Sequence, residues 1–420
     1  MAKIKKIIAR EVLDSRGIPT IEGKLILDNE VHVFAWAVSG KSTGKFEGKE
    51  LRDGDQNRYN GLGVLRAVQI INNVISPKII GTDITKHIDI DHWLKSADGT
   101  DNYSKLGVNT TMVVSQLLFK AAARACKTRK VIYTNKLYNG LFKKDNKMVR
   151  IPSPIFNLIN GGEHGSKNLN FQEFHVIFAT TTPFRNSLEL AGSVYDNIKQ
   201  ILKKRDALTS VSEEGGFTPT LYNNTEVFGV IKEGLLAKRL KLGVDVFTGI
   251  DCSASHYYID GKYRIRESTN GYKLDKYIDF IADLSDKYNI LILEDPIHEE
   301  DDVGWQKLNQ KVGKQSYVVA DDFVAGNIER LTNAVKEDAA NAVVLKFNQV
   351  GTMYEILEMA KNIKQAGLKL VFSHRLGEST DSFIADIAVG LQADFVKFGS
   401  PSRGERVAKY NRLLEIEKIL

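Results

Sequence analysis

The sequence predicts an α/β protein in which an eight-stranded (β/α) barrel follows a smaller α+β region. The chain has 420 residues, which is too many for one ordinary core, so two domains are expected. In the second part of the chain, short apolar runs recur and each ends in a polar residue beside a turn. Amphipathic segments such as Met353–Ala366 separate the later runs. Buried strands that alternate with helices indicate a barrel.

The first part of the chain has the pattern of an α+β unit. Its expected elements are strands at Ile4–Leu13, Thr20–Asp28 and Val31–Val38, then helices at about Leu62–Ile75 and Thr110–Ala125. A polar stretch at residues 143–147, followed by Pro152 and Pro154, indicates a boundary near residue 150. We therefore expect an N-terminal α+β capping domain at residues 1–140 and a barrel that carries the catalytic residues at 150–420.

The barrel strands are expected at eight runs. These are Asn170–Glu173, Ser210–Glu214, Val246–Asp251, Ile290–Glu294, Tyr317–Asp321, Ala342–Lys346, Leu370–His374 and Phe395–Lys397. In barrels of this kind the active site lies at the C-terminal ends of the strands. The polar residue that closes each run is therefore the place where the site is expected.

The composition is that of a soluble protein and excludes little else. The net charge of +6 is spread along the chain, so it suits anionic small molecules as well as nucleic acid. The two cysteines, Cys126 and Cys252, make a disulfide framework improbable and favour a reducing compartment. We expect neither a secretory signal nor a membrane span, and hence a cytoplasmic enzyme or binding protein.

Three successive runs end in a carboxylate, at Asp251, Glu294 and Asp321. Neighbouring strands lie roughly 5 Å apart, so acids at adjacent strand ends converge on one point. They would repel one another, and a bound divalent cation is the simplest resolution. Oxygen ligands favour Mg²⁺ over zinc. One such acid alone indicates only a strand end that faces solvent, whereas three in register predict a metal site.

Two other runs end in lysine, at Lys346 and Lys397. Burial and neighbouring positive charge lower the pKa of a lysine, so Lys346 beside a metal is expected to act as a general base. The alternative is a lysine whose ammonium group extends from the barrel end into solvent. Two lysines beside an acid cluster favour the catalytic interpretation.

Glu214 follows another acid, Glu213, and precedes Gly215-Gly216. The sequence predicts a turn that exposes one carboxyl group with a raised pKa, which is able to protonate a leaving hydroxyl. A plain acidic loop is the alternative. The loop Ser39–Gly44 is similar to a phosphate cradle, but it has no lysine in the Walker position and predicts little alone.

Many short motifs from about residue 8 to the end of the chain resemble those of enolases. They are Asp14–Gly17, Ser39–Gly44, Glu50–Asp55, Ser104–Gly107, Asn157–Gly162 with His164, Phe171–Phe174, Glu214–Phe217, Leu293–Pro296, Lys346–Gln349, Ser373–Arg375, Gly399–Arg403 and Glu405–Asn411. The resemblance implies an enolase-type barrel and a Mg²⁺-dependent lyase. The implied reaction is the reversible dehydration of 2-phosphoglycerate to phosphoenolpyruvate, in glycolysis and gluconeogenesis.

The resemblance also implies a role for particular residues. Asp251, Glu294 and Asp321 match the ligands of a first Mg²⁺, and Ser39 matches a ligand of a second, so two ions per active site are expected. The implied catalytic residues are Lys346 as base, Glu214 as acid, Glu173 as its supporting carboxylate, His164 and Lys397. The implied substrate-binding residues are Gln172, His164, Arg375, Leu376, Lys397 and Lys346, with Arg375 on the phosphate.

Some residues depart from the enolase pattern. Leu376 stands where the family usually has Ser, and Lys41 where it usually has Ala, so Lys41 either binds phosphate in compensation or hinders loop closure. Two alternatives therefore remain open. One is an enolase-like dehydratase of another acid, and the other is an inactive binding or scaffold protein on the same fold. The complete set of base, acid and metal ligands argues against the inactive protein.

The resemblance implies a homodimer or a higher homo-oligomer, joined in part by a glutamate–arginine salt bridge between subunits. The glutamate position matches Glu22, whereas the arginine position matches Glu415. Two carboxylates that meet at an interface disfavour association. We therefore expect a dimer that is weaker than usual for the family, or one with altered packing.

Overall fold

The computed structural model describes residues 2–40, 45–165 and 167–420, so the expectation about Lys41 lies outside the described residues. The strands are β1 (Ile4–Leu13), β2 (Pro19–Leu27), β3 (His32–Trp36), β4 (Ser153–Asn160), β5 (Glu173–Phe178), β6 (Val246–Asp251), β7 (Tyr258–Ile259), β8 (Lys262–Tyr263), β9 (Ile290–Glu294), β10 (Tyr317–Ala320), β11 (Ala342–Leu345), β12 (Lys369–Ser373) and β13 (Phe395–Lys397). The α-helices are α1 (Leu65–Gln69), α2 (Ser76–Ile79), α3 (His87–Asp98), α4 (Val108–Ala125), α5 (Lys130–Phe142), α6 (Phe184–Lys204), α7 (Asn224–Leu236), α8 (Leu274–Tyr288), α9 (Asp302–Val312), α10 (Ile328–Lys336), α11 (Met353–Gln365), α12 (Phe383–Gly390) and α13 (Gly404–Glu417).

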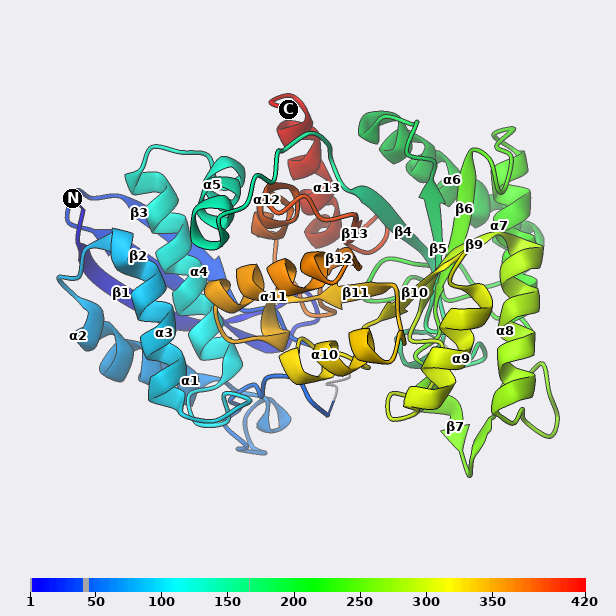
Figure 1. The fold of residues 1–420 in the computed structure, drawn as a ribbon, viewed down its shortest axis with the longest axis horizontal. Coiled ribbons are helices and arrows are strands. Elements are labelled where there is room, and N and C mark those ends of the chain that lie inside the picture. The colour runs from blue at the N-terminus through cyan, green and yellow to red at the C-terminus, as the bar shows by residue number, and fades with distance from the viewer. Residues whose placement is uncertain (1, 41–44, 166) are drawn as a thin grey trace.

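The N-terminal part is a three-stranded antiparallel sheet, β1-β2-β3, covered by helices (Figure 1). The sheet packs against α4, and the contact is close at Gly23. A side chain there would meet Val113 and Leu117 of α4, because an added Cβ would lie 2.7 Å from an atom of each. The glycine therefore lets the helix lie directly on the sheet. The three predicted strands are confirmed to within two residues at each end.

The helix predicted at about residues 62–75 is not one regular helix. Here the chain forms α1, then a π-helical segment, η2 (Ile70–Ile75), and then the short α2. Pro77 lies in the first turn of α2, where its missing N–H costs no hydrogen bond. The apolar periodicity was therefore a correct sign of helical structure, although it did not show the change of helix type.

The second part is a closed barrel with the strand order β10-β11-β12-β13-β4-β5-β6-β9. This confirms the predicted eight-stranded barrel, and six of the predicted runs are its strands β6 and β9 to β13. The runs at 170–173 and 210–214 were wrong as strands. Residues 170–172 lead into β5, which begins at Glu173, and Val211 makes only an isolated bridge to Phe217. The two missing places are taken by β4 and β5.

One barrel strand runs against the others. β5 pairs antiparallel with both β4 and β6, whereas the other neighbouring strands of the barrel are parallel. The reason is its connection, because β4 and β5 are joined directly through residues 161–172 without a crossover helix. Glu173 is therefore the first residue of its strand, and yet it lies at the same end of the barrel as the last residues of β4 and β6.

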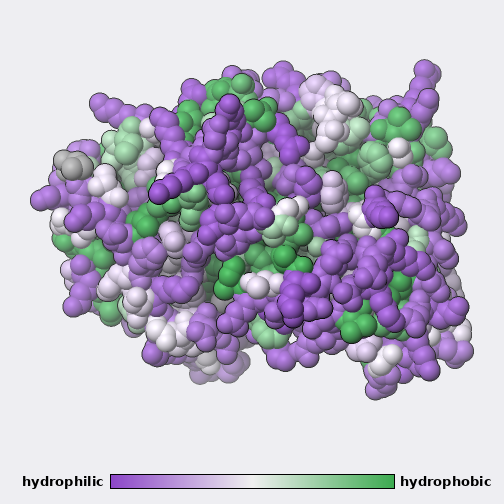
Figure 2. Space-filling model, in the orientation of Figure 1, coloured by the Kyte–Doolittle hydropathy of each residue, from purple (hydrophilic) through white to green (hydrophobic). Residues whose placement is uncertain are grey.

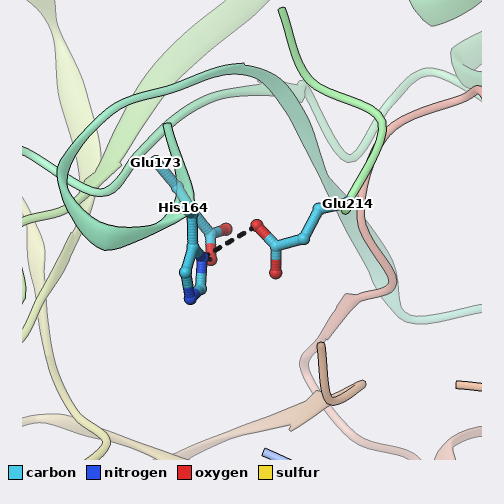
Figure 3. Close-up of side chains that lie close together, drawn as sticks. All are labelled: His164, Glu173 and Glu214. Atoms are coloured by element: carbon cyan, nitrogen blue, oxygen red, sulfur yellow. Dashed lines mark hydrogen bonds and ion pairs between the residues drawn. The ribbon is translucent and has the colours of Figure 1, made fainter. Parts of the chain in front are cut away.

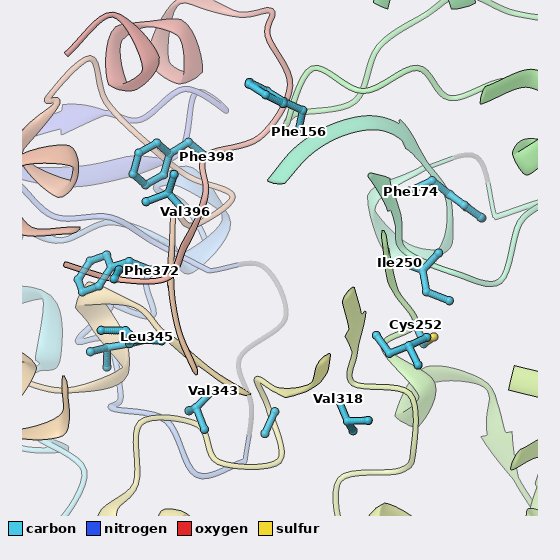
Figure 4. Close-up of a cluster of buried hydrophobic side chains, with 14 of the residues drawn as sticks. Phe156, Phe174, Ile250, Cys252, Val318, Val343, Leu345, Phe372, Val396 and Phe398 are labelled. Atoms are coloured by element: carbon cyan, nitrogen blue, oxygen red, sulfur yellow. The ribbon is translucent and has the colours of Figure 1, made fainter. Parts of the chain in front are cut away.

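Two apolar layers hold the barrel together. Alternate strand residues fill its interior, namely Ile155, Ile177, Ile292, Val319, Ala342, Val344, Val371 and Phe395. Their neighbours along the strands, such as Val318, Val343 and Phe372, point the other way and pack with the surrounding helices (Figure 4). The strand ends can therefore carry polar residues while the barrel body stays apolar.

The surface seen in Figure 2 is mainly hydrophilic, with apolar residues in scattered groups. None of the helices in the described part of the chain is long and apolar enough to cross a membrane. Of the two residues expected to meet at a subunit interface, Glu22 forms an ion pair of 2.7 Å with Arg10. Glu415 is exposed and forms an ion pair with Arg412 at 2.5 Å.

Candidate active site

A pocket at the C-terminal end of the barrel collects most of the predicted site residues. It is lined by Gly40, His164, Gln172, Glu173, Glu214, Asp251, Ser253, Asp321, Asp322, Lys346, Ser373, His374, Arg375, Leu376 and Lys397. Of the residues predicted for the site, Glu294 and Ser39 are not in this lining. Glu294 is fully buried within the carboxylate cluster of the site, and Ser39 lies in a neighbouring pocket.

Strand register explains why the acids meet. Asn160, Glu173, Asp251 and Glu294 lie opposite one another across β4, β5, β6 and β9, so they form one row at the barrel rim. Asp321 follows the next strand, β10. The first four positions are at one level, and Asp321 lies two residues beyond Val319, which pairs with Glu294, so all five side chains belong to the same rim of the barrel.

The ammonium group of Lys397 lies among three of these acids. Its Nζ is 2.6 Å from Glu294 Oε1 and 3.5 Å from both Glu173 Oε1 and Asp251 Oδ2. All four side chains are buried. Although burial lowers the pKa of Lys397, the surrounding carboxylates raise it well above its ordinary value, so the group is held as a cation.

One ammonium does not balance this cluster. Burial, and the charges of Asp251 and Asp321, raise the pKa of Glu294 well above its ordinary value despite the nearby Lys397. Glu294 Oε2 is buried and has no hydrogen-bond partner among the described residues. A buried carboxylate oxygen without a partner among the described residues, on a group that the charges of two further carboxylates act on, fits a divalent cation with oxygen ligands. The donor set of Asp251, Glu294 and Asp321 therefore suits the metal predicted from the sequence.

Lys346 forms an ion pair with Asp321 Oδ2, while Gln349 Nε2 donates to the other oxygen, Oδ1, at 2.9 Å. The lowering of the lysine pKa was predicted for a lysine beside a metal ion, whereas here Lys346 contacts the carboxylate of Asp321 directly. Burial does lower the pKa of Lys346, but the charge of Asp321 outweighs it and raises the pKa above its ordinary value. The sequence showed both residues as strand ends, but not that they would pair directly.

The opposite wall of the pocket carries a histidine–carboxylate pair. His164, in the short 3₁₀ helix η4 (Gly162–His164), places Nδ1 3.1 Å from Glu214 Oε2 and 3.7 Å from Glu173 Oε1 (Figure 3). Asn157 and Asn160 of β4 also donate to Glu214 Oε2, at 3.1 Å and 2.9 Å. Glu214 is thus fixed by donors from the end of β4 and from the start of the β4–β5 connection.

The predicted raised pKa of Glu214 is also wrong. Burial and the charge of Glu173 do raise the pKa of Glu214, but the charge of His164 and hydrogen bonds from His164 and His374 outweigh them and lower it. The proton is held instead on His164. Although burial lowers its pKa, the charge of Glu214 and hydrogen bonds to Glu173 and Glu214 raise the pKa of His164 to about 10.

Two further predicted residues support this cluster. Glu173 also accepts a hydrogen bond from His175 Nε2 at 2.8 Å, so it is held by groups on either side. Gln172 Nε2 donates to Asp251 Oδ2 at 3.3 Å, and its backbone N–H donates to the Asp251 carbonyl at 2.8 Å. Gln172 therefore fixes the orientation of a candidate metal ligand.

The phosphate-binding arginine expected at Arg375 lies on a third wall of the pocket. Both of its terminal nitrogens donate to Glu47, at 2.8 Å and 2.9 Å. Leu376, beside it, is buried and lines the pocket, and its carbonyl accepts a hydrogen bond from Arg406 Nη2 at 2.6 Å. An apolar side chain therefore stands where the family pattern has a hydroxyl group.

Ser39 is not directed toward the carboxylates. Its hydroxyl donates to Glu50 Oε2 at 3.0 Å and accepts from Arg52 Nη2 at 2.9 Å. Its backbone pairs with Gly377, next to the arginine wall. Ser39 therefore lies beside the site, but in this structure its hydroxyl is bonded to Glu50 and Arg52, and its role as a metal ligand stays a prediction.

Sequence reasoning did not assign roles to several residues of the site. His374 Nε2 lies 3.3 Å from Glu214 Oε1, and burial and the charge of Arg406 lower the pKa of His374 to about 4. Asp295 accepts the backbone N–H groups of Asp321 and Asp322 at 2.9 Å each, and these three acids form a second possible cation cluster. His374 closes the predicted run Leu370–His374 and directly follows β12, so the strand-end rule placed it at the site without giving it a role.

A (β/α) barrel whose rim brings two lysines, a carboxylate cluster and a histidine–carboxylate pair into one pocket defines an acid–base enzyme. The family model of the enolase C-terminal TIM barrel domain matches residues 148–420, and that of the enolase N-terminal domain matches residues 4–133. The chain is 40% identical over 417 residues to the enolase of Ehrlichia canis (strain Jake). The aligned residues make up 99% of this chain and 96% of that relative. The chain belongs to the enolase family, and its function is that of an enolase, a hydro-lyase.

The pKa of His164 predicts how stability depends on pH. Because this pKa rises from 6.5 in the unfolded chain to about 10 in the folded one, protonated His164 stabilises the fold fully below pH 6.5. The contribution is lost as the pH rises toward 10. The free energy of unfolding in urea should therefore be greater for the wild type than for His164→Asn, and this difference should be largest at pH 6. It should shrink steadily up to pH 10. A difference that stays constant over this range would show that His164 is neutral in the folded protein.

Proposed function

We propose that the chain catalyses the reversible dehydration of 2-phosphoglycerate to phosphoenolpyruvate with Mg²⁺, in glycolysis and gluconeogenesis. The main support is that Lys346, at the end of β11, and Glu173 of β5, which contacts His164, come from opposite sides of the barrel and line one pocket. The carboxylate cluster belongs to the strands between them, β10, β9 and β6. A base and an acid on different walls suit a reaction that removes a proton from one carbon and a hydroxyl group from the next. Cys126 and Cys252 are free thiols, which supports a reducing compartment such as the cytoplasm.

Asp251, Glu294 and Asp321 would hold the Mg²⁺ ion. When bound, it supplies positive charge where negative charge grows on the substrate carboxylate. The unpartnered Glu294 Oε2 supports this assignment. For Ser39 to hold a second ion, as we also propose, its hydroxyl must leave Glu50 and Arg52.

The lysines act on the acid end of the substrate. Lys346 Nζ takes the proton from the carbon next to the carboxylate, which requires a neutral amine. The Asp321 charge that favours its ammonium form is shared when Asp321 serves as a metal ligand. Lys397, which its carboxylate neighbours hold as a cation, faces the charge that develops on the substrate carboxylate.

The His164–Glu214 pair acts at the neighbouring carbon. The pair holds one proton on His164, and Glu214, fixed by Asn157 and Asn160, lies within hydrogen-bond distance of it. The His164–Glu214 pair delivers this proton to the oxygen of the leaving hydroxyl group. The C–O bond breaks at the same time, and the group leaves as water. Glu173 supports the pair through its contacts with His164 and Lys397.

One observation favours a second candidate, the dehydration of another acid by the same residues. Leu376 is buried and lines the pocket beside Arg375, so the phosphate has one hydroxyl donor fewer. The loss of a hydrogen bond to a charged group costs about 1.5–3 kcal/mol. A comparison of turnover on 2-phosphoglycerate with turnover on acids that lack the phosphoryl group distinguishes the two candidates.

The role of Lys346 is tested with Lys346→Ala. Because the base would be absent, we expect kcat to fall by about 10³-fold or more, with Mg²⁺ binding retained. The assay follows the ultraviolet absorbance of phosphoenolpyruvate with and without Mg²⁺. Lys369→Ala is the control, since this lysine begins β12 at the opposite end of the barrel and pairs with Asp394. Substantial turnover in Lys346→Ala would disprove the assignment.

The metal site is tested with Asp251→Asn and Asp321→Asn. Each variant removes one charge from the ligand set, so calorimetry should show Mg²⁺ binding weakened by at least about tenfold. Activity should be lost, and excess Mg²⁺ should restore it only in part. Asp260→Asn, which changes an exposed acid on the β7–β8 turn, should behave as the wild type. Unchanged Mg²⁺ affinity in both ligand variants would rule out this carboxylate site.

We also propose a homodimer that is weaker than usual for the family, because Glu22 and Glu415 are like-charged. Each carboxylate already has an arginine partner in its own subunit, Arg10 and Arg412, and so neither requires a partner across the interface. Glu415→Arg should strengthen the dimer in sedimentation experiments over a dilution series. A wild-type dimer that persists at nanomolar concentration, and that Glu415→Arg leaves unchanged, would contradict the proposal.

A further inference from the structure

Arg375 already holds an anion that belongs to the chain itself. Glu47 Oε1 accepts from Arg375 Nη1 at 2.8 Å, and Oε2 accepts from Nη2 at 2.9 Å. The two residues, Glu47 and Arg375, are only 3% and 5% exposed. Two parallel charge-assisted bonds are also the geometry in which arginine binds a phosphoryl group. Glu47 thus presents to Arg375 the same pair of acceptors that a phosphoryl group would present.

The backbone beside Glu47 is attached to the barrel loops independently of this ion pair. The ring of Phe46 lies under the guanidinium group of Arg330, 3.9 Å from ring centre to Cζ. Lys45 forms a 2.7 Å ion pair with Glu300, and Gly48 N–H donates to the Gln349 carbonyl at 3.2 Å. These contacts therefore keep Glu47 beside the pocket even when its carboxylate no longer binds Arg375.

The ion pair with Glu47 gives the buried guanidinium group of Arg375 an anionic partner when substrate is absent. A buried guanidinium group without an anionic partner is costly, and removal of one member of a buried ion pair is destabilising. A bound phosphoryl group is itself such a partner, so Arg375 has an anion in both states. Gln349, which donates to Glu47 at 3.5 Å and to Asp321 at 2.9 Å, connects this carboxylate to the candidate metal site.

We propose that Glu47 occupies the phosphoryl subsite of Arg375 as an internal competitor and is displaced by the phosphoryl group of the substrate. This rests on the proposed function. A phosphoryl group carries a charge of about −1.5 to −2 at neutral pH, so it competes with a carboxylate for the guanidinium group. An acid that offers only a second carboxylate has no such advantage. The cost of displacing Glu47 is the same for every anion that uses Arg375, so the competition weakens all of them by one common factor, and only an anion that binds the guanidinium group strongly displaces the carboxylate.

The test measures binding of inorganic phosphate to the Mg²⁺-loaded protein by calorimetry, which does not depend on turnover. Glu47→Gln keeps the shape but removes the competing charge, so phosphate should bind about tenfold more tightly, the equivalent of about 1.4 kcal/mol. The KM for 2-phosphoglycerate should fall by a similar factor. Glu47→Asp, which keeps the charge on a shorter side chain, should give a smaller gain. Glu300→Gln, on the flanking ion pair, should leave phosphate affinity unchanged.

A double-mutant cycle identifies the arginine as the point of competition. In an Arg375→Ala background, Glu47→Gln should change phosphate affinity less than twofold. Phosphate affinity that is unchanged or weaker in both Glu47→Gln and Glu47→Asp, with melting temperatures near that of the wild type, would overturn the proposal and make Glu47 a residue that orients Arg375. If Glu47→Gln binds phosphate more tightly but the wild type does not turn over 2-phosphoglycerate, the proposed function fails while the competition by Glu47 stands.

Discussion

The mutual repulsion of buried carboxylates, balanced by the ammonium group of Lys397, is the constraint on which the rest of the site depends. Glu173, Asp251 and Glu294 come from three neighbouring strands, and their register brings them to one level. Burial alone would force such acids to bind protons. One lysine stabilises part of their charge, and the remainder fits a divalent cation. The apolar layers inside and outside the barrel keep these strand ends in place, so the polar cluster is held by parts of the fold that are not themselves polar.

Most of the barrel could be predicted because parallel buried strands leave a simple signal, a short apolar run with a polar residue at its end. β4 and β5 did not give this signal. β4 contains Pro154, which is tolerated near the start of a strand, and two buried asparagines, so its apolar pattern is interrupted. β5 begins with its polar residue, Glu173, because the strand runs in the opposite direction. A rule that seeks polar residues at the ends of runs therefore placed this strand too early in the chain.

The identity of the site residues was more predictable than their electrostatics. Strand-end positions and family motifs were sufficient to bring Lys346, Lys397 and the carboxylates together. The pKa direction expected for Glu214 was wrong, and the pKa of Lys346 beside Asp321 differs from the one expected beside a metal, because each depends on a direct partner from another element. Asp321 pairs with Lys346, and His164 pairs with Glu214 from across a loop. Distances between side chains of different elements are set by the packing of those elements, and a local sequence pattern holds no information on that packing. The partner of Arg375 was missed for the same reason, since Glu47 lies 328 positions away.

The reversed direction of β5 divides the pocket into two parts of different sequence origin. Much of the acid wall, including Asn157, Asn160, His164 and Glu173, comes from one hairpin whose two strands are hydrogen-bonded neighbours. Lys346, the proposed base, comes from the end of β11, much later in the chain. Insertions or substitutions confined to that single hairpin can therefore alter proton donation while the base stays unchanged. The two half-reactions, removal of the proton and loss of the hydroxyl, can in this way diverge independently during evolution.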